Sequence, residues 1–251
     1  SFVGMVDTVN EVPVEKKDGP LKIWEYPKKD SVYIVGVDVA EGKENEDLKR
    51  DYSVIQIINA CTKEQIVVYR SQDSWDIIAY IAVILAKWYN KAYLVIESNS
   101  HGLAVISKVR DLHYPFLYKE RDYNETGTER QERVGFRTTG RSKPMLISFS
   151  AEMFRDGFIK LNDRCTLDEM SKFSQDPNGR LRASIGHDDT VMALALAFWG
   201  LRFAPILKRI PKEEEAIRWL PRMKDWEEHF HTQSDGTEKD WIRKTFKNYL
   251  N

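Results

Sequence analysis

The strongest constraint on this chain is a run of β-branched and apolar residues, Ser31-Val-Tyr-Ile-Val-Gly-Val-Asp-Val-Ala40. Both faces of such a segment are apolar, which predicts a strand buried on both sides of a helix-covered sheet. One carboxylate, Asp38, lies inside this run. Burying a carboxylate is costly unless it is hydrogen-bonded, paired or bound to a metal. Asp38 is therefore the first candidate for a functional residue.

The segments that follow predict a mixed sheet. We expect strands over residues 52–58, 65–69 and 92–96, helices over 74–89 and 103–112, and a short strand near 116–118. Short links join the strand over residues 31–40 to the strands over 52–58 and 65–69, which indicates an antiparallel meander of three strands. A helix separates the third strand from the fourth, over 92–96, so we expect the first and fourth strands to pair in parallel.

The second half of the chain is predicted to be mostly helical. Residues 119–139 contain few apolar anchors and are interpreted as a loop or β-hairpin. Ser142-Lys-Pro144 is a good helix start, and the helix should end near residue 156. Thr166-Leu-Asp-Glu169 has the pattern of a capping box that opens a short helix. A strand is expected over residues 180–184.

The most apolar stretch, Val191 to Phe203, is too short to span a bilayer and indicates a buried helix. His187-Asp-Asp-Thr190 precedes it and should cap it. With 251 residues, of which 42% are hydrophobic, the chain can bury a real core. Cys61 and Cys165 form neither a disulfide framework nor a zinc pattern, which favours a reducing compartment.

The ends of the chain differ from its middle. Residues 1–31 carry several prolines and charges and are interpreted as a linker with one short strand. Residues 205–251 are Trp-rich and charged, and we expect a peripheral segment there. The main domain should therefore occupy residues 32–204. The first residue is Ser1 rather than Met, which favours a piece of a longer protein.

Acidic residues stand where the predicted elements end. Glu97 closes the fourth strand, and parallel pairing would bring it near Asp38, while Asp188 and Asp189 begin the apolar helix. Taken singly, a charge at a strand end or an aspartate at a helix start is ordinary. As a set, the four carboxylates favour a functional site. The same reasoning favours structural roles for Asp51 and His187.

Three segments in order carry a specific resemblance: Val-Gly-Val-Asp38-Val-Ala-Glu-Gly42, Val-Ile-Glu97-Ser-Asn-Ser-His-Gly102 and Gly-His-Asp188-Asp189-Thr-Val-Met-Ala193. The chain resembles the nuclease domain of large terminase subunits, the DNA-packaging motors of tailed bacteriophages and herpesviruses, over about residues 32–203. The resemblance implies an α/β, ribonuclease H-like mixed sheet flanked by helices, with a β-hairpin insertion.

The resemblance also implies a function. It implies an endonuclease that cuts concatemeric double-stranded viral DNA in the host cytoplasm. Asp38, Glu97 and Asp189 would be metal ligands, with Asp188 an alternative or supporting ligand. The cofactor would be Mg²⁺ or Mn²⁺, as two ions, because hard cations prefer carboxylate oxygens and two of them can stabilise both the attacking and the leaving oxygen. The partners would be an ATPase domain of the same full-length protein, the portal and the small terminase subunit, with no membrane involved.

The even charge balance, 38 basic against 39 acidic residues, excludes a globally basic nucleic-acid coat. A local exception lies between residues 133 and 143, where four basic residues occur without an acidic one: Arg133, Arg137, Arg141 and Lys143. Because Lys and Arg neutralise phosphates, this stretch is the main candidate for DNA contact, and a solvated hairpin is the alternative. Arg180 and Arg182 form a second, weaker candidate.

The sequence lacks the pattern of a phosphate-binding ATPase loop. The only Gly-Lys pair, Gly42-Lys43, is followed by Glu44 and has Val37 where the first glycine should stand. The chain is therefore interpreted as the nuclease half of a motor, with residues 1–31 as the remnant of the link. Two alternatives stay open: a transposase- or resolvase-like nuclease, and a DNA-gripping or docking domain without strong cleavage.

Overall fold

The computed structural model describes residues 1–40, 51–123, 129–155, 157, 159–175, 181–183 and 187–202. Contacts divide the chain into two compact units, Ser1–Ala204 and Pro205–Asn251. The expected peripheral segment over residues 205–251 lies outside the described residues. The fold below is that of the first unit.

A seven-stranded sheet in the order β2-β1-β3-β6-β5-β4-β7 organises the first unit. Its centre is the predicted antiparallel meander of β4 (Tyr33–Asp38), β5 (Ser53–Asn59) and β6 (Glu64–Ser71). The next strand, β7 (Tyr93–Ile96), pairs with β4 in parallel, with Val37 opposite Ile96. The predicted mixed sheet is therefore confirmed, and the parallel pair brings the last residues of β4 and β7 to the same edge.

The N-terminal residues extend this sheet. Three strands, β1 (Phe2–Asp7), β2 (Val12–Glu15) and β3 (Leu21–Ile23), form where one short strand was expected. They add to the sheet because β3 pairs with β6, and because its two apolar side chains, at its first and last positions, are fully buried. The prolines and charges of this segment suggested a linker, but burial against the free edge of β6 overrides that local signal.

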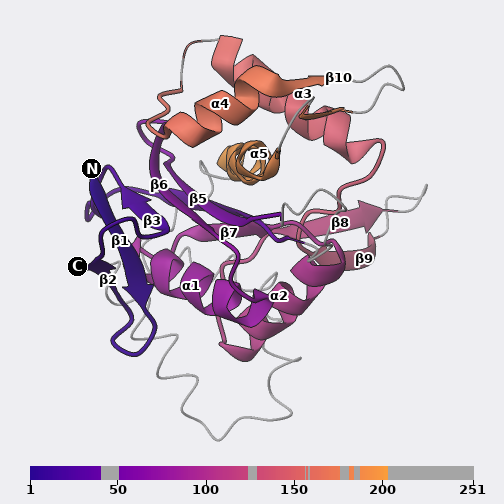
Figure 1. Ribbon diagram of the computed structural model, residues 1–251. Helices are drawn as coiled ribbons and strands as arrows, with labels where there is room; N and C mark the ends of the chain where they lie inside the picture. The colour runs from indigo at the N-terminus through magenta and orange to yellow at the C-terminus, as the bar shows by residue number, and fades with distance from the viewer. Residues whose placement is uncertain are drawn as a thin grey trace, which may run out of the picture. The chain divides into compact units, whose positions relative to one another are not determined.

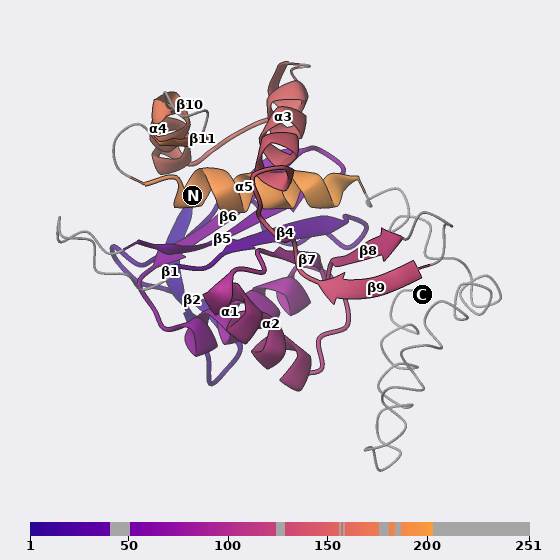
Figure 2. The ribbon, with the colours of Figure 1, turned by 90° about the vertical axis from the view of Figure 1, so that its right-hand side faces the viewer.

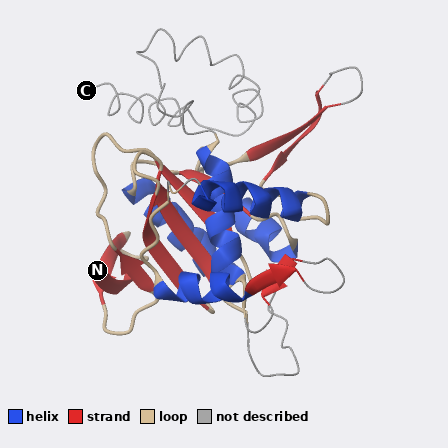
Figure 3. Ribbon diagram, turned by 90° about the horizontal axis from the view of Figure 1, so that it is seen from above, coloured by secondary structure: helices blue, strands red, loops and turns tan. Residues whose placement is uncertain are grey.

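Helices cover both faces of the sheet (Figures 1 and 2). On one face lie α1 (Trp75–Trp88) and α2 (Ser100–Asp111). On the other face lies α5 (Asp189–Leu201), with α3 (Ser142–Arg155) and α4 (Arg164–Lys172) above it. Seen from above, these helices lie across the strands (Figure 3). Two covered faces explain why every residue of β4 and β5 is buried.

The approach of α5 to β4 is close enough to need glycine. A Cβ atom at Gly36 would lie 2.0 Å from the carbonyl oxygen of Ala193 and 2.5 Å from the amide nitrogen of Ala197. The backbone of α5 therefore packs directly on β4. Within the parts of the chain that the structure describes, no helix is both long and apolar enough to cross a bilayer.

Two short antiparallel ribbons complete the unit: β8 (Lys119–Tyr123) with β9 (Glu129–Val134), and β10 (Phe173–Gln175) with β11 (Leu181–Ala183). The first is the expected hairpin insertion. Near residues 116–118 there is only an isolated bridge, between Leu94 and Leu117, in place of a strand. The capping-box prediction is wrong: α4 begins at Arg164, because Asp163 is its N-cap and accepts from the amide of Thr166.

Candidate active site

The parallel pair of strands brings the first two candidate carboxylates together. Asp38 is the last residue of β4, and Glu97 directly follows β7. The Glu97 amide donates to the Val37 carbonyl at 3.0 Å, which continues the register one step beyond the strand. The two side chains interact electrostatically, because, after burial, the negative charge of Glu97 raises the pKa of Asp38.

The third and fourth candidates arrive with α5. Asp189 is the first residue of this helix, and Asp188 is its N-cap. The Asp189 carboxylate accepts from the Tyr52 amide at 2.9 Å, beside the start of β5. The charges of Asp188 and Asp189 both act on Asp38. All four acidic residues singled out in the sequence therefore lie at one edge of the sheet, brought there by β4, β7 and α5.

Burial makes this cluster electrostatically costly without a cation. Asp38, Glu97 and Asp189 are each no more than 9% exposed. Burial, and then the negative charge of Glu97, raise the pKa of Asp38 well above its usual range. Burial raises the pKa of Asp189 to about 6, with the charge of Asp51 adding to the effect and the Tyr52 hydrogen bond opposing it. A bound cation would favour the ionised forms and reverse both shifts.

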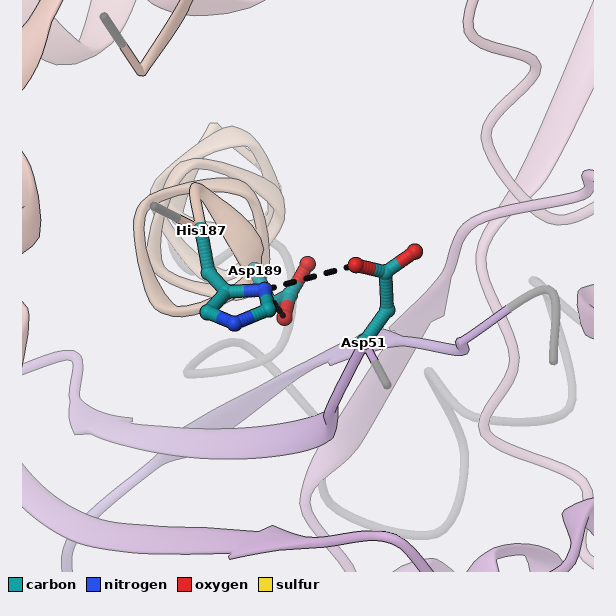
Figure 4. A group of neighbouring side chains, drawn as sticks. All are labelled: Asp51, His187 and Asp189. Carbon is teal, nitrogen blue, oxygen red and sulfur yellow. Dashed lines mark ion pairs between the residues drawn. The ribbon is translucent and has the colours of Figure 1, made fainter. Parts of the chain in front are cut away.

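Two further residues, Asp51 and His187, lie beside Asp189 (Figure 4). The Nδ1 atom of His187 lies 3.3 Å from Oδ1 of Asp51 and 3.7 Å from Oδ2 of Asp189. One ligand atom of each of these three residues lies within 4.8 Å of the others, so among the described residues this is the group of acidic and histidine side chains close enough to hold one metal ion. Sequence reasoning favoured structural roles for Asp51 and His187, and the only local signal was that His187 precedes Asp189 by two positions.

Asn99 fixes the position of Glu97. Its side-chain amide donates to Oε2 of Glu97 at 3.1 Å and to the Val39 carbonyl at 3.4 Å. Its oxygen accepts from the Gly102 amide at 2.7 Å and thereby caps α2. One side chain thus links the end of β7, the end of β4 and the start of α2.

The basic stretch runs past this cluster. Phe136 forms a parallel bridge with Glu97, since the Ser98 amide donates to the Phe136 carbonyl at 2.8 Å. Lys143, on α3, places its Nζ atom 3.3 Å from Oδ2 of Asp188. The other basic residues of the stretch are exposed: Arg133, Arg137 and Arg141. Arg182, on β11, is exposed as well. Arg180 lies outside the described residues.

The donors at this edge suit a hard divalent cation. Carboxylate oxygens dominate, with one imidazole beside them, and both cysteines lie elsewhere in the chain, at positions 61 and 165. Oxygen-rich sites of this kind favour Mg²⁺ or Mn²⁺ over thiolate-preferring metals. Such an arrangement can hold a cation that activates water next to a phosphate.

The comparisons with known proteins agree with this geometry. Residues 35–199 match the family model described as "Terminase RNaseH-like domain". The large terminase nuclease from thermophilic phage G20c with bound magnesium has 23% identity and a TM-score of 0.58, with 79% of this chain and 98% of that chain covered. The large terminase nuclease domain of Thermus phage P74-26 has 23% identity and a TM-score of 0.55, with coverage of 78% and 94%. At such identities the structural likeness establishes a shared fold, which confirms the predicted ribonuclease H-like class.

Proposed function

Because the chain belongs to the family of terminase RNaseH-like domains, we propose that it is a metal-dependent endonuclease that hydrolyses double-stranded viral DNA during genome packaging. The observation that carries this proposal is the buried cluster of Asp38, Glu97 and Asp189 at one edge of the sheet. Uncompensated, these charges would repel a phosphodiester. With divalent cations bound, the same cluster attracts one.

The residues of the cluster have distinct roles in this proposal. Asp38, Glu97 and Asp189 hold the cations, and Asp188 is an alternative or supporting ligand held near them by Lys143. When bound, two Mg²⁺ or Mn²⁺ ions supply an activated water and neutralise charge on the attacking and leaving oxygens. Asn99 keeps Glu97 aimed at the site. The G20c nuclease has been solved with bound magnesium and with bound cobalt, which supports a divalent-cation cofactor here.

The substrate chemistry tests this proposal directly. Supercoiled plasmid incubated with the protein and Mn²⁺ should be nicked and then linearised, and EDTA should stop the reaction. Cleavage of many unrelated plasmid sequences is expected, because an acid–metal site reads the phosphate backbone and not the bases. Absence of nicking at protein concentrations that bind DNA would favour the docking alternative. Family membership disfavours the transposase-like alternative.

DNA binding should depend on the exposed part of the basic stretch. Replacing Arg133, Arg137 and Arg141 by Ala should weaken binding and flatten its salt dependence, by about 0.9 in the slope of log K against log[salt] for each phosphate that the protein no longer neutralises. Filter binding or fluorescence anisotropy from low to moderate salt measures this slope. The matched control removes the same charge from exposed lysines outside the basic stretch: Lys16 and Lys17, which follow β2, and Lys29, which precedes β4. Equal slopes for both triple variants would remove the basic stretch from the DNA path.

The wider context follows from the same proposal. Residues 32–204 contain the nuclease machinery, and the segments 1–31 and 205–251 flank it. The natural substrate is concatemeric DNA in the host cytoplasm, cut as packaging starts and ends. An ATPase domain of the full-length protein, the portal and the small terminase subunit are the partners of such a motor.

A further inference from the structure

The helix that carries Asp189 begins without its own cap. The first backbone amides of any helix need acceptors, and an aspartate at the N-cap position normally supplies one. Asp188 occupies the N-cap of α5, yet within the described residues its side chain makes no capping hydrogen bond. It pairs instead with Lys143, at 3.3 Å.

A carboxylate from another helix takes over the capping role. Glu169, on α4, accepts from the Thr190 amide at 2.9 Å and from the Thr190 hydroxyl through the same oxygen, Oε2. Thr190 directly follows Asp189 and is fully buried. Its carbonyl accepts from Nε2 of Gln56, on β5, at 2.8 Å. The peptide units beside Asp189 are therefore fastened to both α4 and the sheet.

Arg70 links this cap to the other support of Asp189. From β6, its Nη2 atom lies 3.6 Å from Oε1 of Glu169. The guanidinium carbon lies 3.4 Å from the centre of the Tyr52 ring, in cation–π geometry. Tyr52 is the residue whose amide binds the Asp189 carboxylate. One guanidinium thus contacts both the residue that caps α5 and the residue that binds the side chain of Asp189.

We propose that Glu169 is a positioning residue for the metal ligand Asp189. By capping α5 from α4, it fixes the first turn of the helix and so holds the Asp189 carboxylate at the Tyr52 amide, and it leaves Asp188 available beside the cluster. The inference rests on the proposed function, because it takes Asp189 to be a ligand. Residues that orient metal ligands typically change metal affinity about 10- to 100-fold when they are mutated.

The test is the Mn²⁺ affinity of the folded, metal-free protein, measured by isothermal titration calorimetry. Glu169→Gln keeps the size of the side chain but replaces one of its oxygens with an amide group and removes the charge. We expect the Mn²⁺ dissociation constant to rise about tenfold. The matched control is Glu25→Gln, the same change at a partly buried carboxylate that bonds Asn59 at 2.8 Å, at the end of β5 remote from the site. The control should leave the affinity unchanged even if it lowers the melting temperature.

The outcomes separate this inference from the proposed function. A wild-type protein that fails to bind Mn²⁺ overturns both. Mn²⁺ binding by the wild type together with an unchanged affinity in Glu169→Gln overturns the positioning role alone. If Glu169→Gln does not fold, the pair Thr190→Ser and Thr190→Val decides, because serine keeps the hydroxyl donor and valine removes it at similar size. We expect the Thr190→Ser protein to bind Mn²⁺ with wild-type affinity and the Thr190→Val protein to bind it more weakly. Equal Mn²⁺ affinities of the two variants would overturn the inference.

Discussion

Asp38→Asn should abolish DNA cleavage and, at the same time, make the metal-free protein more stable. Loss of a central ligand should remove about 4 kcal/mol of transition-state stabilisation, so plasmid cleavage with Mn²⁺ should fall on the order of 10³-fold. Asp38 is buried, and its burial together with the negative charge of Glu97 raises its pKa. A neutral amide removes this electrostatic cost, so the melting temperature in EDTA should rise by about 3 °C for each 1 kcal/mol gained.

No gain in stability is expected from the same substitution at an ordinary surface aspartate. Asp7, at the end of β1, accepts hydrogen bonds from Val9 and Asn10, which lower the pKa of its carboxyl. Asp7→Asn should therefore leave cleavage at the wild-type level and give no gain in melting temperature. Thermal unfolding in EDTA and a plasmid assay on both variants make the comparison. Retained cleavage in Asp38→Asn would contradict its assignment as a ligand.

Mn²⁺ should stabilise the protein strongly above pH 7 and weakly at pH 5. Metal binding requires ionised carboxylates, so affinity rises as pH passes through the pKa of each ligand. At a free Mn²⁺ concentration 100 times the dissociation constant, the stabilisation is about 2.7 kcal/mol. One unit below the pKa of Asp189, which burial raises to about 6, about one tenth of this group is ionised. The dissociation constant then rises about tenfold, and about 1.4 kcal/mol remains.

In the metal-free protein, the contribution of Asp189 to stability should instead decrease as pH rises. The pKa of Asp189 in the folded state, about 6, lies above the value of about 3.9 of an unfolded aspartate. Between these values the folded state binds more protons at Asp189, so the contribution of Asp189 to stability falls by up to about 3 kcal/mol as pH rises from about 4 to 6. Denaturant unfolding across this pH range, with EDTA or with Mn²⁺, measures both trends. A Mn²⁺ effect that is the same at pH 5 and above pH 7 would contradict carboxylate coordination by Asp189.

Local patterns were sufficient for the centre of the fold. The β-branched run around Asp38 and the strand ending at Glu97 were both predicted, and the helix between them required parallel pairing. The four acidic residues could be singled out because Asp38 lies inside an apolar run and the other three stand where strongly patterned elements begin or end. The family resemblance also follows from these short segments, since they occur in the order that the fold requires.

Long-range contacts decided what the sequence could not. The N-terminal residues became three strands because β6 offered an unpaired edge. Asp51 and His187 joined Asp189 through the packing of α5 on the sheet.

The pattern Thr166-Leu-Asp-Glu169 has the residue types of a capping box, but Asp163 caps that helix and Glu169 caps α5 instead. Sequence alone determined which four acidic side chains are candidate ligands and on which elements they lie. Tertiary structure decided their partners, because hydrogen bonds and charge interactions between residues far apart in the chain form only once β4, β7 and α5 have packed together.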